Sequence, residues 1–135
     1  LGPDHLIQIG VRAVSKEEFE YAQKQKITFY TSDDIRKEGA AIIAQRINDA
    51  IPPGPPIYIS IDMDVLDPAF APAVGNPEAG GLTTSQLLTI LRVISPRAMI
   101  FDLTEVTPQY DQGVTAIAAA RIITEFLCVQ ASRLD

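Results

Sequence analysis

The sequence predicts an α/β fold in which helices flank a mainly parallel sheet. Short apolar runs typical of strands alternate along the chain with longer segments of helical spacing. The 135 residues are 47% hydrophobic and 21% charged, which is the composition of one compact domain. Parallel strands joined through helices are connected by right-handed crossovers.

The first part of the chain is expected to form a strand, a helix and a second strand. The apolar run 6–11 ends in small residues and predicts a strand covered on both faces. Ser15 is an N-cap with Glu18 as its capping-box partner, and this helix continues to about residue 25. The run 27–30 predicts the second strand.

A longer helix and the central strand follow. Capping residues at 31–34 open one helix with isoleucines at helical spacing, and it ends before the proline cluster 52–56. The β-branched run 57–62 predicts a strand, and a loop follows at 63–81. Thr83 is the expected cap of the next helix.

The chain is expected to close with a helix, a strand and a helix. The helix capped by Thr83 spans 84–94, and the apolar run 99–106 predicts the last strand. The closing helix, 114–131, is apolar nearly all round, so we expect it to be buried. Cys128 lies in this helix and is expected to be a buried thiol.

Three carboxylates lie together at the end of strand 57–62. Side-chain alternation along a strand places Asp62 and Asp64 on one side, where they could hold one divalent ion or bridge two. Asp62 has apolar neighbours on a strand expected to be buried, so a cation or a salt bridge must compensate its charge. Asp67 precedes Pro68 and is expected to form a turn.

Glu105 is a further candidate, because it lies near the carboxyl end of the last strand. Ligands of open α/β sheets gather outside the carboxyl ends of the strands. We therefore expect Glu105 to face the same crevice as Asp62 and Asp64.

These motifs resemble the signature of the ureohydrolases, the arginase and agmatinase family. The resemblance covers nearly the whole chain and implies a three-layer, arginase-like α/β fold with a mainly parallel sheet. The matching positions are the run 60–64, Pro68, Pro72, Ala73, Gly81 and, in the same order along the chain, the segments 8–12 and 105–111.

The resemblance also implies the chemistry. The family uses a binuclear manganese centre, whose bridging hydroxide attacks a guanidinium carbon and releases urea. By this resemblance Asp62 bridges both Mn²⁺ ions, Asp64 ligates one, and Glu105 holds the guanidino substrate by charge-assisted hydrogen bonds. The segment 77–82 resembles agmatinases more than arginases, which implies conversion of agmatine to putrescine and urea in polyamine biosynthesis.

The family's upstream metal-binding motifs have no counterpart in this sequence. His5 is the only histidine, and we expect it at the surface. Residues 1–135 therefore read as the C-terminal part of a single ureohydrolase-like domain, an incomplete half that is inactive alone. One alternative is a non-catalytic ureohydrolase-like module acting in assembly or binding. An unrelated phosphatase that uses Asp62 ranks below both.

Charge and composition limit the kinds of partner that the chain is expected to bind. The net charge is −6 and no Lys/Arg cluster occurs, so we expect no nucleic acid partner. No apolar stretch is expected to reach the roughly 18 to 20 residues of a membrane span. One cysteine indicates a cytoplasmic protein, and the resemblance implies a homo-oligomer.

Overall fold

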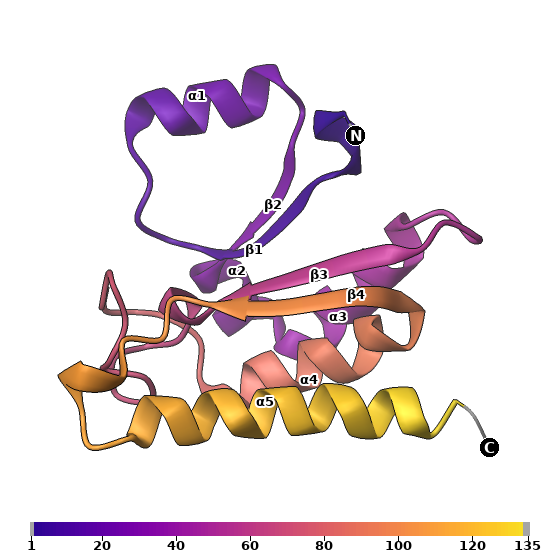
Figure 1. Cartoon of the computed structure of the whole chain (residues 1–135). Helices are drawn as coiled ribbons and strands as arrows, with labels where there is room; N and C mark the ends of the chain where they lie inside the picture. The colour runs from indigo at the N-terminus through magenta and orange to yellow at the C-terminus, as the bar shows by residue number, and fades with distance from the viewer. Residues whose placement is uncertain (1, 134–135) are drawn as a thin grey trace.

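The computed structural model describes residues 2–133 as two pairs of strands packed with helices (Figure 1). The strands are β1 (Ile7–Val11), β2 (Thr28–Thr31), β3 (Ile57–Asp62) and β4 (Ala98–Thr104). The α-helices are α1 (Lys16–Lys24), α2 (Ser32–Glu38), α3 (Ala40–Ala50), α4 (Thr84–Ile94) and α5 (Val114–Ala131). Strand and helix alternate as predicted.

All strand pairing in the described part of the chain is parallel, which confirms that prediction. β1 pairs with β2, and β3 pairs with β4 in a register that sets Asp62 opposite Thr104. Within residues 2–133, however, the two pairs do not share a ladder. The strands therefore form two separate two-stranded sheets rather than one.

The core lies between the β3–β4 pair and the helices α3, α4 and α5. Figure 1 shows α4 and α5 below these two strands, with the β1–α1–β2 segment above them. In β3, Ile57, Ile59 and Ile61 alternate toward the core. Both α3 and α4 bury an apolar stripe. The fully buried larger apolar side chains include Ile43, Met63, Leu66, Leu82 and Ile122.

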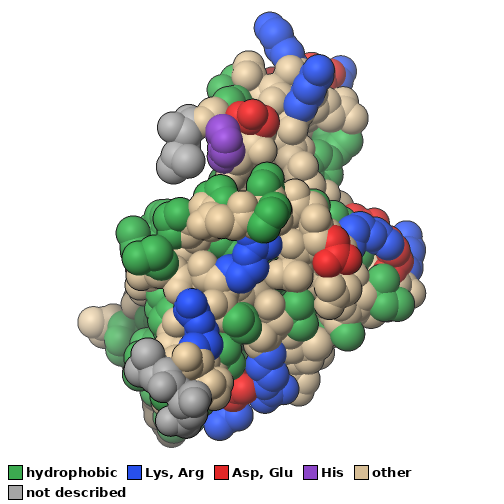
Figure 2. Space-filling view, turned by 90° about the vertical axis from the view of Figure 1, so that its right-hand side faces the viewer, with side chains coloured by type: hydrophobic (Ala, Val, Ile, Leu, Met, Phe, Trp, Pro, Cys, Tyr) green, Lys and Arg blue, Asp and Glu red, His purple; other side chains and the backbone are tan. Residues whose placement is uncertain are grey.

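The β1–α1–β2 segment, which we call the upper lobe, packs on the core through Ile7, Ile9 and Tyr30 of its strands, whereas its helix packs loosely. Helix α1 is capped by Ser15 and Glu18 as predicted, but it contains no buried residue. Phe19 of α1 touches Phe29 of β2 edge to face, with ring centroids 5.6 Å apart. Figure 2 shows this lobe standing out from the rest of the molecule.

Two helix predictions were wrong. The predicted helix over 31–51 is divided into α2 and α3 at Gly39, whose φ of 99° lies outside the helical region. Helix α5 buries only Thr115, Ala119 and Ile122. It packs one face on the core, and among residues 2–133 no element covers its other face. Cys128 on α5 is accordingly exposed, contrary to prediction.

Helix α5 also corrects the prediction about membrane spans. It has 18 residues and is apolar enough to cross a bilayer, judged by length and composition only. Its inner face packs as a helix on a protein core does, since Phe126 stacks on Phe101 of β4 with centroids 4.3 Å apart. Core helices of soluble proteins meet the same length and composition criteria.

Candidate metal and substrate site

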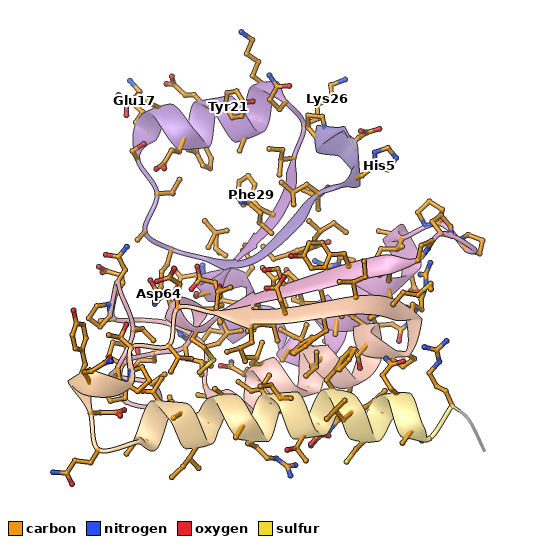
Figure 3. All side chains as sticks on the ribbon, viewed as in Figure 1. His5, Glu17, Tyr21, Lys26, Phe29 and Asp64 are labelled. Atoms are coloured by element: carbon orange, nitrogen blue, oxygen red, sulfur yellow. The ribbon has the colours of Figure 1, made fainter. Side chains whose placement is uncertain are left out.

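The carboxyl ends of β3 and β4 bring the predicted site residues to one edge of the sheet. Asp62 is the last residue of β3 and pairs in register with Thr104, and Glu105 follows Thr104 directly. Asp64 lies just beyond β3 in the 3₁₀ turn Met63–Val65. Figure 3 shows Asp64 at this end of the strands, where the loops gather.

Asp62 is exposed, so the expectation that its carboxylate is buried was wrong. Its neighbours Ile61 and Met63 are buried as expected, but the Asp62 side chain lies on the outer face of the strand pair. Its Oδ1 accepts a hydrogen bond from the Asp64 N–H at 2.9 Å and thereby caps the turn. Strand alternation ends at Asp62 and therefore does not orient Asp64.

Asp64, rather than Asp62, has the buried carboxylate oxygen that needs a compensating partner. Its Oδ2 accepts from the Asn76 backbone N–H at 2.9 Å. Its Oδ1 is buried and has no hydrogen-bond partner within residues 2–133, and no basic side chain of that range pairs with Asp64. A buried carboxylate oxygen without a partner costs free energy, which a bound cation would recover. The salt-bridge alternative is therefore not formed in the described structure.

Glu105 lies beside Asp64 in a strained backbone conformation. Its φ of 63° is rare for a residue with a side chain and costs on the order of 1 kcal/mol. A Cβ built on Gly75 would stand 2.9 Å from Glu105 Oε2 and 3.9 Å from Asp64 Oδ2. The missing side chain at Gly75 therefore leaves room for two carboxylates to approach the same spot.

Asp67 forms the predicted turn. Its Oδ1 accepts from the Ala69 N–H at 2.9 Å and its Oδ2 from the Gly80 N–H at 2.8 Å. These backbone hydrogen bonds, that of Ala69 first, lower the pKa of the Asp67 carboxyl. Gly80 has the φ of 80° that a turn glycine adopts, whereas Gly75 has an ordinary φ and allows a close approach of neighbouring side chains.

Arg12 contacts the backbone of the candidate site, and the sequence did not single it out as a site residue. Its guanidinium donates to the backbone carbonyl of Asp64 at 2.5 Å and to that of Glu78 at 2.8 Å. It therefore ties the turn after β3 to the loop that contains Gly75. The available signal was a basic residue directly after strand β1, whose carboxyl end meets the site.

The described residues do not by themselves form a complete metal site. Within residues 2–133 no three His, Cys, Asp or Glu side chains come close enough to hold an ion. The Asp64 N–H donates to Asp62 Oδ1, and carboxylate oxygens of Asp64 and Glu105 both lie within 4 Å of the position that a Cβ on Gly75 would take. His5 is exposed on the upper lobe, as predicted (Figure 3). Oxygen donors and the orphaned Oδ1 fit a hard divalent cation such as Mn²⁺, with further ligands required.

Comparison with known proteins gives one consistent answer. The sequence model of the Arginase family matches residues 1–129. An agmatinase of Photorhabdus laumondii is 36% identical over 135 residues, covering 98% of this chain and 42% of the relative. A guanidinobutyrase of Pseudomonas aeruginosa is 36% identical over 130 residues, covering 93% of this chain and 40% of the relative.

Solved structures agree with the fold. The agmatine ureohydrolase of Thermoplasma volcanium superposes with a TM-score of 0.85 at 36% identity, covering 93% of this chain and 42% of that one. The arginase of Bacillus caldovelox gives 0.89 at 25% identity, covering 93% and 44%. The arginase-like fold class is therefore confirmed, and the chain spans about two fifths of the length of the relatives it matches. Its motifs, its fold and the family match together show that this chain belongs to the arginase family.

Proposed function

We propose that the complete protein hydrolyses the guanidino group of a small cation, agmatine first, to urea and an amine, with manganese as cofactor. The proposal is carried by Asp64 Oδ1, which is buried near Glu105 and has no hydrogen-bond partner among the described residues. Similarity to proteins named agmatinase supports the reaction. The chain is also similar to a guanidinobutyrase and a proclavaminate amidinohydrolase, so other guanidino compounds must be tested as substrates.

The roles follow from the chemistry of the side chains. Asp62 and Asp64 would hold the metal through carboxylate oxygens, which suit Mn²⁺. Two such ions, when bound, supply a nucleophile at neutral pH by lowering the pKa of water. Glu105 accepts charge-assisted hydrogen bonds from the guanidinium and orients its carbon. The net charge of −6 attracts a cationic substrate.

Residues 1–135 supply too few ligands for the whole centre. We propose that they form the C-terminal part of one ureohydrolase-like domain and that the remaining ligands come from outside them. Metal affinity depends on the number and geometry of ligands, so this chain alone binds Mn²⁺ weakly and releases no urea. Urea release at ordinary enzyme rates from the 135-residue chain with agmatine and Mn²⁺ would refute that statement.

The test of the function uses the full-length protein. Urea release is measured from agmatine, arginine and guanidinobutyrate, for the natural sequence and for Asp62→Asn and Glu105→Gln. Both variants are expected to lose at least a hundredfold in kcat/KM. The matched control is Glu17→Gln, an exposed carboxylate on α1 well away from Asp64 (Figure 3). Full activity in both site variants would show that the site is misplaced.

An assembly role is the second candidate, and the exposed surface favours it. The accessible surface is 8189 Å², whereas a compact monomer of this mass exposes about 6,900 Å², so the rest of the domain or a partner subunit covers part of it. Much of α5 is apolar and exposed, including Ile117 at 71% and Leu127 at 58%. We propose that the protein is a homo-oligomer. Mass measurement by light scattering tests this, and a stable monomer in the full-length protein would contradict it.

The cellular location and the remaining partners are also proposals. Cys128 is a free, exposed thiol, and such thiols persist in a reducing compartment, which supports the cytoplasm. The acidic charge balance opposes binding to nucleic acid. Fractionation with an antibody against the full-length protein tests the location, and recovery in the membrane pellet would contradict it.

A further inference from the structure

Residues 73–76, which we call the bridging loop, connect the site to the start of α5. The Ala73 carbonyl accepts from the Thr107 N–H at 2.9 Å, two residues beyond Glu105. Gly75 leaves the space that Glu105 Oε2 occupies. The Asn76 N–H donates to Asp64 Oδ2 at 2.9 Å. One short loop therefore lies against Asp64 and Glu105, two of the three acidic residues of the proposed site.

The other end of this loop is anchored by a buried hydroxyl. Thr115 is fully buried in the first turn of α5, and its Oγ1 accepts from the Ala73 N–H at 2.9 Å. The same hydroxyl donates its only proton to Asp111 Oδ2 at 2.7 Å, which leaves its lone pairs for Ala73.

Asp111 fixes the orientation of that hydroxyl. Its carboxylate also accepts from the Gly113 N–H at 2.7 Å and from the Thr115 N–H at 2.8 Å. These bonds, the Thr115 hydroxyl first, lower the pKa of Asp111, so the group is ionised at neutral pH and acts only as an acceptor. The direction of each hydrogen bond from Asp111 to Ala73 is therefore determined.

We propose that Thr115 is a positioning residue of the site, acting through the bridging loop on Asp64. With Oδ2 held by the Asn76 N–H, rotation of the Asp64 carboxylate is restrained, and Oδ1 is the atom left to bind a cation. Thr115 sets the position of the loop that supplies that N–H. The proposal rests on the proposed function only for the identity of the cation.

Two readouts separate positioning from a merely structural role. Amide hydrogen exchange of Ala73 and Asn76, measured by NMR without metal, reports on the loop. Mn²⁺ affinity, measured by electron paramagnetic resonance on the folded full-length protein, reports on Asp64. Thr115→Val keeps the shape and removes the hydroxyl, and Thr115→Ser restores it. The matched control is Thr124→Val, because among the described residues the Thr124 hydroxyl donates only to the Ala120 carbonyl within α5.

The expected result is specific to the hydroxyl. Thr115→Val speeds exchange at both Ala73 and Asn76 at least tenfold and weakens Mn²⁺ binding about tenfold or more. Thr115→Ser and Thr124→Val stay close to the natural protein in both readouts. Unchanged Asn76 exchange and Mn²⁺ affinity in a folded Thr115→Val protein would overturn the proposal, even if its melting temperature fell.

A second variant tests the proposal if Thr115→Val does not fold. Asp111→Asn weakens the polarisation of the Thr115 hydroxyl while keeping a side chain of similar size, and a smaller change in the same direction is expected. No change in Asn76 exchange would overturn the proposal here too. If the natural protein binds no Mn²⁺, the proposed function fails, whereas the exchange data still decide whether Thr115 positions the loop.

Discussion

Gly75→Ala separates substrate binding from metal binding at the proposed site. The new methyl group would lie 2.9 Å from Glu105 Oε2, and ordinary contact begins at 3.4 Å, so Oε2 must move by about 0.5 Å. The same methyl lies at an ordinary 3.9 Å from Asp64 Oδ2. The backbone at Gly75 needs no left-handed φ, so alanine fits it without strain. Only the position of the Glu105 carboxylate is disturbed.

The expected loss is in the use of substrate. Misplacement by up to about 1 Å can cost on the order of a hundredfold, so we expect kcat/KM for agmatine to fall by about ten- to a hundredfold, mainly through KM. Mn²⁺ affinity and the melting temperature should stay unchanged. In the full-length protein, urea release at varied agmatine concentration measures kcat and KM. Electron paramagnetic resonance measures Mn²⁺ affinity, and thermal unfolding measures the melting temperature.

The control for this prediction lies in the same loop. Asn76→Ala keeps the backbone N–H that bonds Asp64 and adds no atoms beside Glu105, so its kinetics should match the natural protein. The reasoning is refuted if Gly75→Ala leaves KM unchanged. It is also refuted if Mn²⁺ affinity falls as steeply as kcat/KM.

Three further predictions concern stability. Gly81→Ala would place a Cβ 2.4 Å from the Asp67 backbone nitrogen, which cannot yield as a side chain can, so urea titration should show a loss of about 3 kcal/mol. Ile122→Ala removes a fully buried side chain and should cost about 3 kcal/mol in the same assay, and a loss below 1 kcal/mol would contradict its place in the core. Asp67 and Asp111 have lowered pKa values, so their stabilisation is present above the ordinary carboxyl pKa near 4 and is lost as pH falls through the lowered values. The urea midpoint should drop between pH 5 and pH 2, less steeply in Asp111→Asn, and an equal slope would contradict the assignment.

Local signals in the sequence predicted the elements well. The Ser15 and Glu18 capping box and the Thr83 cap both begin helices where predicted, because their hydrogen bonds span only three residues. The burial of α5 was not predictable from the same information. Its apolar composition is real, but burial depends on which elements cover each face, and α5 is covered on one face only.

The candidate site was likewise predictable from the sequence only in part. Spacing correctly predicted that Asp62, Asp64 and Glu105 lie near one another, because strand ends converge at one edge of a parallel sheet. The predicted burial of the Asp62 side chain was wrong, because strand β3 has one face in the core and one in solvent. Arg12 and Thr115 act across separations of 52 and 42 positions, so no local pattern could reveal their contacts.

The loose packing of helix α1 affects which part of the protein unfolds locally. Helix α1 contains no buried residue, and within residues 2–133 no ladder joins β1–β2 to β3–β4, so α1 and the loops on either side of it should open locally while α3 and α4 stay closed. Arg12 reaches from the end of β1 to the Asp64 carbonyl, so each such opening releases the turn that carries Asp64. A protease that cuts the chain in this opened state would loosen the turn that carries Asp64 without touching the core.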